Sequence, residues 1–83
     1  MYTRHGCHLC TAAWDTLRRQ QRRFGFDLVA VDIDTDSDLV SKHGESVPVV
    51  TVDGRIRFRG GVNAVLLRRV LAAEMAKATR KDG

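Results

Sequence analysis

The chain has 83 residues and a formal net charge of +4, and eleven of its fourteen basic residues are arginines. A chain of this length forms one small domain that buries only about 60% of its unfolded surface, and no apolar run approaches the roughly 20 residues of a membrane-spanning helix. The arginines occur mainly as adjacent pairs without interleaved aromatic residues, which argues against nucleic-acid binding, and the first residues lack the apolar stretch of a secretory signal. We therefore expect a cytoplasmic protein that binds neither nucleic acid nor a membrane.

The first half of the chain predicts a strand, a helix and a second strand, in that order. Residues 1–3 look like the end of a strand, a helix should begin at or next to Cys7 and run to Phe24, and Gly25 should end it. A second strand is predicted over residues 26–34, where apolar residues alternate with polar ones. The first strand should be central in the sheet and about five residues long. Either the natural start therefore lies upstream, or this central strand is unusually short.

The second half predicts a short helix, a hairpin and a final helix. The short helix should begin near residues 34–37, which offer several capping side chains, and should end at Gly44. Residues 47–52 and 55–59 should pair as an antiparallel hairpin. The final helix should run from about residue 62 to 78. These elements predict one domain over residues 1–79, followed by a polar C-terminal tail at residues 80–83.

The order β-α-β-α-β-β-α predicts an α/β fold. Two strands joined through a helix run parallel with a right-handed crossover, and the hairpin adds two antiparallel strands. We therefore expect a mixed four-stranded sheet flanked by helices on both faces, which is the thioredoxin-like arrangement.

The two cysteines of the chain, Cys7 and Cys10, lie three residues apart at the predicted start of the first helix. A disulfide between them would close so small a loop that the chain-entropy model gives only about 2 kcal/mol of stabilisation. The pair is therefore better placed for reversible redox chemistry than as a structural staple. Cys7, at the helix tip, should be exposed and stabilised as a thiolate by the unpaired helix amides, with Arg4 adding a positive charge close by. Cys10, one turn in, should be more shielded and act as the resolving thiol.

The residues around the dithiol leave alternatives open. A zinc site needs four converging ligands, and His5, His8 and His43 do not supply a second pair at a suitable spacing, so we expect no metal ion. His8 either tunes the thiolate or simply faces solvent at the helix start. Trp14, one turn beyond the dithiol, either flanks the site or has a packing role.

With these features assembled, the chain resembles the glutaredoxins, and more narrowly the small bacterial glutaredoxin-like proteins of the DUF836 group. The stretch Tyr-Thr-Arg-His-Gly-Cys-His-Leu-Cys at residues 2–10 carries the resemblance, with His5 where a proline is common. Residues 31–34, 46–48 and 58–61 also fall in the order and spacing of the family. The resemblance covers residues 2 to about 71, and it implies a thioredoxin-like fold.

The resemblance implies a thiol–disulfide oxidoreductase in which Cys7 is the nucleophile and Cys10 the resolving thiol. Its substrate would be a disulfide-containing protein or a small-thiol mixed disulfide, and glutathione or another low-molecular-weight thiol would be the reductant. The protein would act as a monomer with no bound cofactor. The usual dithiol of glutaredoxins has Pro-Tyr where His8 and Leu9 lie here, so the resemblance does not assign glutathione as the specific thiol.

The resemblance also implies a substrate-binding role for residues outside the dithiol. Arg4 matches a basic position that helps to bind the thiol, and Val47 and Pro48 match a cis-proline loop whose backbone pairs with an extended substrate. Gly60 and Gly61 match a loop that receives the γ-glutamyl carboxylate of glutathione at the start of the last helix, where free amides attract an anion. The alternative for these glycines is an ordinary turn before a helix. Asn63 follows them where an acidic residue is usual.

Two other classes of function fit the same sequence. Cys7 could ligate an iron–sulfur cluster or carry a metal, as in some glutaredoxin relatives. The scaffold could also serve as a non-catalytic adaptor for protein contacts, and the function of such an adaptor would survive the loss of Cys7.

Overall fold

The computed structural model describes residues 1–82, with side chains described through residue 77. In chain order its elements are β1 (Tyr2–Thr3), α1 (His8–Phe24), β2 (Val31–Asp32), the 3-10 helix η1 (Ile33–Thr35), α2 (Ser37–His43), β3 (Val49–Val52), β4 (Arg55–Arg59) and α3 (Ala64–Asp82). The described strands form a four-stranded sheet in the order β2-β1-β3-β4. β1 is parallel to β2 and antiparallel to β3, and β3 is antiparallel to β4. The predicted mixed sheet with β1 at its centre is therefore confirmed.

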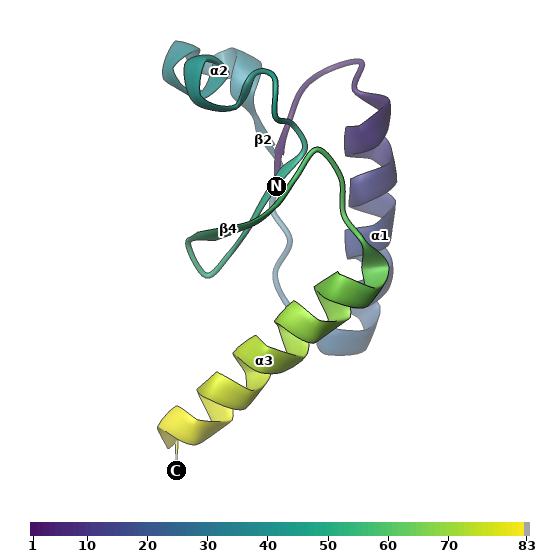
Figure 1. Ribbon diagram of the computed structural model, residues 1–83, viewed down its shortest axis with the longest axis vertical. Coiled ribbons are helices and arrows are strands. Elements are labelled where there is room, and N and C mark those ends of the chain that lie inside the picture. The colour runs from purple at the N-terminus through teal and green to yellow at the C-terminus, as the bar shows by residue number, and fades with distance from the viewer. Residues whose placement is uncertain (83) are drawn as a thin grey trace.

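The helices lie in two layers around this sheet. α1 and α3 cover one face, where Leu17, Val50, Leu67 and Leu71 form a buried cluster. Successive residues of a strand point to opposite faces, and Tyr2 of β1 stacks on His43 of α2 with ring centroids 4.7 Å apart. α2 therefore covers the other face, and Figure 1 shows it set apart from α1 and α3. This arrangement is the thioredoxin-like α/β fold that the order of elements predicts.

The limits of α1 and α2 follow from their capping residues, as the sequence predicts. Cys7 is the N-cap of α1, and Gly25 ends the helix in the left-handed region with φ 72°, its N–H donating to the Gln21 carbonyl. Asp36 caps α2 by accepting a hydrogen bond from the Asp38 backbone, and Gly44 ends that helix. Cys7 thus caps the helix, and Cys10 lies within its first turn.

β2 is much shorter than the predicted strand over residues 26–34. β1 offers only Tyr2 and Thr3 as partners, so only Val31 and Asp32 pair with it, and a strand needs a paired neighbour. Residues 26–30 form no strand, and Val29 on the expected apolar face is 65% exposed. Beyond β2 the chain turns into η1, because the Asp32 side chain accepts a hydrogen bond from the Asp34 backbone.

A cavity of about 340 Å³ lies between residues 26–29 and β3. Met1 lines it at one end, and Leu17, Leu67 and Leu71 line it from the helices. Met1 already pairs with the segment before β2, donating to the Val29 carbonyl and accepting from the Val31 N–H. The cavity therefore occupies the path that β1 would take if it were extended toward its N-terminal side.

The second half of the sheet differs from prediction only at element ends. The hairpin turns at Asp53 and Gly54, both with positive φ, as expected of a two-residue turn. β3 begins at Val49 rather than at residue 47, and a cis peptide bond joins Val47 to Pro48 in the loop before it. The predicted hairpin is therefore confirmed, with a shorter first strand.

α3 begins later and ends later than predicted. It starts at Ala64 because the Asn63 side chain accepts hydrogen bonds from the Val65 and Leu66 backbones and so acts as the cap. The helix continues through the predicted boundary at residue 79 as far as Asp82, and the last residue of the predicted tail, Gly83, lies outside the described residues.

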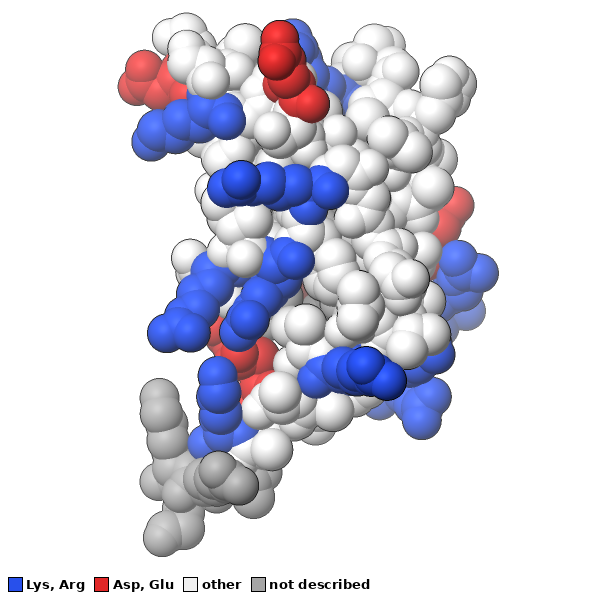
Figure 2. All heavy atoms as spheres, viewed as in Figure 1, with Lys and Arg blue, Asp and Glu red and all other residues white. Residues whose placement is uncertain are grey.

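The surface is strongly basic, in line with the net charge of +4. Figure 2 shows many more lysine and arginine side chains than acidic ones on the face turned to the viewer. Among the helices in the described part of the chain, none combines the length and apolar character needed to cross a membrane.

Candidate active site

The Cys7 sulfur lies at the N-terminal end of α1, where helix amides have no partner inside the helix. Its Sγ accepts a hydrogen bond from the Cys10 backbone N–H at 3.1 Å, and the Cys7 carbonyl accepts the first helical bond, from the Thr11 N–H at 3.2 Å. Gly6, with φ 77°, provides the left-handed turn that brings the chain into the helix. The sulfur is thus the acceptor that caps the helix.

Cys10 lies one turn further along α1, on its inner face. Cys10 is 3% exposed, whereas Cys7 is only half-buried, and both are free thiols in this structure. The expected difference in accessibility between an outer and an inner thiol is therefore present. An incoming disulfide can reach Cys7 first, with Cys10 behind it.

The expected lowering of the Cys7 pKa is wrong for the reduced dithiol. Burial raises the pKa of Cys7, and the neighbouring Cys10 thiol raises it further, whereas the backbone N–H groups of Cys10 and Leu9 act in the opposite direction without outweighing them. A thiolate in this half-buried position is less well hydrated than a thiolate in water, and the hydrogen bonds from the two amides do not make up the difference.

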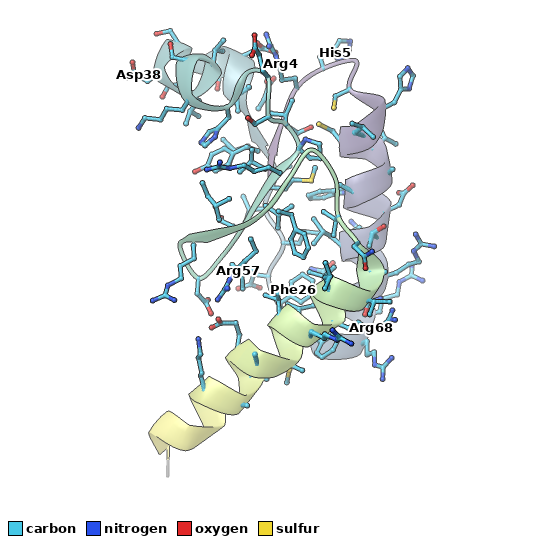
Figure 3. The ribbon with its side chains drawn as sticks, viewed as in Figure 1. Arg4, His5, Phe26, Asp38, Arg57 and Arg68 are labelled. Atoms are coloured by element: carbon cyan, nitrogen blue, oxygen red, sulfur yellow. The ribbon has the colours of Figure 1, made fainter. Side chains whose placement is uncertain are left out.

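The Arg4 guanidinium is paired with a carboxylate. It binds the Asp34 carboxylate through two hydrogen bonds, of 2.8 Å and 3.3 Å, and donates a third, of 3.3 Å, to the Gly44 carbonyl. These contacts with Asp34 raise the pKa of Arg4 above its ordinary value. Figure 3 shows Arg4 beside α2, with His5 on the loop that leads into α1. The expected contribution of Arg4 to the dithiol stays a prediction, and the structure adds that its guanidinium is engaged by a carboxylate.

The cis-proline loop and the glycine loop are joined to each other. Pro48 is buried, and the Gly60 N–H donates to the carbonyls of Ser46 and Pro48 at 2.9 Å and 3.0 Å. The Val47 N–H donates to the His43 carbonyl at 3.2 Å. The structure therefore brings the two loops named in the sequence together, with the N–H groups of Gly60 and Val47 already engaged.

At the start of α3, two backbone N–H groups are bonded to a side chain of the protein itself. The Asn63 Oδ1 accepts from the Val65 and Leu66 N–H groups at 2.9 Å and 3.1 Å. Gly61, the second glycine of the loop, is half-buried beside this cap. The sequence did carry a signal for this role, since asparagine directly before an apolar helical pattern is a strong capping residue.

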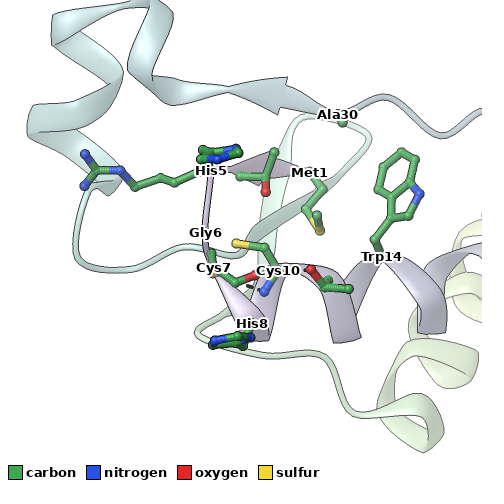
Figure 4. Close-up of a pocket in the computed structure, with 11 residues that line it drawn as sticks. Met1, His5, Gly6, Cys7, His8, Cys10, Trp14 and Ala30 are labelled. Atoms are coloured by element: carbon green, nitrogen blue, oxygen red, sulfur yellow. Dashed lines mark hydrogen bonds between the residues drawn. The ribbon is translucent and has the colours of Figure 1, made fainter.

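A cavity of about 550 Å³ opens beside the dithiol. Its lining includes Met1, Thr3, Cys7, Cys10, Trp14 and Ala30. Trp14 is half-buried and flanks the site rather than packing in the core. Figure 4 shows its indole rising from α1 toward Ala30, with Met1 between the indole and the cysteines. The cavity therefore extends from the nucleophile toward β2, away from α3.

The two histidines of the first turn lie at the rim of this cavity. His5 and His8 both line it and both are exposed. His43 lies in the last turn of α2 and stacks on Tyr2, away from the dithiol. Within the described part of the chain, no group of three or more histidine, cysteine or acidic side chains is arranged to hold a metal ion.

The comparisons with known proteins agree with this arrangement. The model of the glutaredoxin-like domain (DUF836) matches residues 1–72. The X-ray structure of the structural-genomics target protein XcR50 from X. campestris is 37% identical to this chain, with a TM-score of 0.73, and the match covers 87% of this chain and 92% of that one. No curated protein matches the chain. Since the family model spans most of the sequence and the solved relative shares its fold, this chain belongs to the glutaredoxin-like (DUF836) domain family.

Proposed function

We propose that the protein is a thiol–disulfide oxidoreductase in which Cys7 attacks a substrate disulfide and Cys10 resolves the intermediate. One observation carries this proposal: the half-buried Cys7 sulfur accepts the Cys10 backbone N–H at the tip of α1, with the buried Cys10 thiol one turn behind it. When Cys7 ionises, this hydrogen bond becomes charge-assisted and strengthens. Two cysteines three apart in a first helical turn are near enough for a short disulfide.

The proposed cycle conserves electrons and protons. The Cys7 thiolate forms a bond to one sulfur of the substrate disulfide, and the other sulfur leaves as a thiolate that takes a proton from water. Cys10 then loses its proton and displaces the substrate sulfur from Cys7, forming the Cys7–Cys10 disulfide. The substrate gains two electrons and the dithiol loses two. Two equivalents of a low-molecular-weight thiol, or one dithiol, return the protein to its reduced form.

The raised pKa of Cys7 shapes this chemistry. A smaller fraction of molecules carries the Cys7 thiolate at neutral pH than would for a free cysteine. Each such thiolate is, however, a stronger nucleophile than the thiolate of a cysteine with a low pKa. Loss of the proton is therefore part of each turnover. The protein works from its dithiol form, which suits a reducing compartment such as the cytoplasm, where thiols are kept reduced. It acts as a monomer and needs no bound cofactor for this reaction.

The test is a single-turnover reaction of the reduced protein with bis(2-hydroxyethyl) disulfide, followed by mass spectrometry. The unmodified protein should lose two hydrogens and release two equivalents of 2-mercaptoethanol. Cys10→Ser should stop at a mixed disulfide on Cys7, and Cys7→Ser should react no faster than an unfolded peptide thiol. If Cys7→Ser matches the unmodified protein, the redox proposal fails. If the purified protein carries the visible absorption of an iron–sulfur cluster held by Cys7, the cluster function replaces it.

A further inference from the structure

We propose that the cavity beside Trp14 selects the substrate, and that it takes an apolar side chain next to the reacting cysteine of a peptide disulfide. This inference rests on the proposed redox function and names its substrate class. It assigns recognition to the β2 side of the dithiol, opposite the loops that the family resemblance singled out.

The first step concerns the groups that would otherwise bind an anionic thiol such as glutathione. Arg4 is paired with Asp34 at 2.8 Å. The Gly60 N–H bonds two carbonyls of the cis-proline loop. The Asn63 side chain already accepts from two amides at the start of α3, those of Val65 and Leu66. A carboxylate entering there would have to displace internal hydrogen bonds, which offsets much of what its own bonds would contribute.

The second step concerns the cavity itself. Its volume of about 550 Å³ is within the range of small-molecule sites. Met1, Trp14 and Ala30 line it on the side of the cysteines that leads toward β2, as Figure 4 shows. An indole and a thioether both favour apolar and aromatic partners. Because Cys7 and Cys10 line the same cavity, a side chain held against Trp14 places its own cysteine sulfur near the nucleophile.

The third step is charge. Arg4, the one arginine or lysine in the described lining, is paired with the Asp34 carboxylate, and the terminal ammonium of Met1 donates to the Val29 carbonyl, so both cations are already engaged with groups of the protein. His5 and His8 stand at the rim beside Cys7, as Figure 4 shows. An apolar group can contact Trp14 without the cost of removing water from a charged group. The redox step is unchanged, since the side chain only orients the disulfide.

The experiment compares three disulfides with the reduced protein at about pH 7.5 and about 0.15 M salt, where charge steering is damped. They are the homodisulfides of N-acetyl-Cys-Phe-amide and N-acetyl-Cys-Glu-amide, and glutathione disulfide. Each rate is divided by the rate of the same disulfide with free dithiothreitol, which removes intrinsic reactivity. The phenylalanine disulfide should react about tenfold faster than both others.

Variants locate the source of that preference. Trp14→Ala should reduce it to less than about threefold, whereas Trp14→Phe should retain it. Ala30→Phe places a ring inside the cavity and should also remove the preference. The matched control is Val29→Phe, one residue earlier, exposed and outside this cavity, which should keep it. Because Ala30 is exposed, its replacement does not disturb the core even if Trp14→Ala fails to fold.

Each outcome has a defined meaning. Equal corrected rates for the three disulfides, or a preference for glutathione disulfide, would overturn the assignment while leaving the redox function intact. A preference that survives both Trp14→Ala and Ala30→Phe would place recognition outside the cavity and also overturn it. If the unmodified protein reduces none of the three disulfides, the proposed function itself fails.

Discussion

Around the Cys7 sulfur, burial and the Cys10 thiol oppose the backbone N–H groups that stabilise a thiolate. The sequence predicts the place of both cysteines correctly, because a cap and a first helical turn are local features. It could not predict that Arg4 is paired with a carboxylate, since Asp34 lies thirty residues away in the chain and meets Arg4 only in the folded protein. The pairing of Arg4 therefore depends on a tertiary contact that no local pattern records.

The raised pKa of Cys7 predicts how its reactivity depends on pH. The thiolate is the reactive form, so alkylation of Cys7 by iodoacetamide should accelerate about tenfold per pH unit from neutral pH upward. Its midpoint should lie above that of the same cysteine in the unfolded chain. Peptide mapping by mass spectrometry after timed alkylation measures both midpoints.

Cys10→Ala provides the control for this titration. Removing the second thiol removes one of the causes that raise the pKa, so the Cys7 midpoint should move to lower pH. A rate that is already constant below neutral pH in the unmodified protein would show instead that the helix amides dominate the site.

Among the elements, the short β1 limits the length of the strand that pairs with it. The sequence predicts a long second strand beside it, because apolar and polar residues alternate over residues 26–34. A sequence pattern does not show how many partners a strand will find, and here β1 pairs with β2 at only two positions. The cap at Asn63 follows a local rule, because asparagine directly before an apolar helical pattern is a strong capping residue.

Adding residues before Met1 should therefore stabilise the sheet. A Val-Leu-Thr extension places its leucine two positions before Met1 and so on the same face, toward the cavity lined by Leu17, Leu67 and Leu71. Burial of these side chains should exceed the cost of ordering them and raise the free energy of unfolding by about 1–3 kcal/mol. Urea denaturation measures the change, and a Gly-Ser-Gly extension is the control. Equal stability of the two extended proteins would mean that the cavity does not accept a strand.

At the scale of the whole molecule, the order of elements was enough to predict the fold. Short connections and right-handed crossovers leave few ways to assemble β-α-β-α-β-β-α, and the family match over residues 1–72 agrees. The surface charge is also a property of the whole chain, with fourteen basic against ten acidic residues. This excess of positive charge attracts acidic molecules over distances longer than a single contact.

The net charge predicts a salt dependence of the encounter with substrate. An acidic peptide disulfide should be reduced several-fold faster at low ionic strength than at about 0.3 M salt, because a positive protein attracts it and salt screens that attraction beyond about 10 Å or less. A neutral peptide disulfide should change little. Initial rates over a salt series measure both, and parallel slopes for the two substrates would rule out steering by the basic surface.

Trp14 is the single tryptophan of the chain, and it lines the same cavity as Cys7 and Cys10. Disulfides quench the excited state of a nearby indole more strongly than thiols do. The ultraviolet emission of this protein therefore comes from one chromophore that is placed beside its reacting sulfurs. Opening and closing of the dithiol can be followed optically in the unlabelled protein, in the time of a stopped-flow trace.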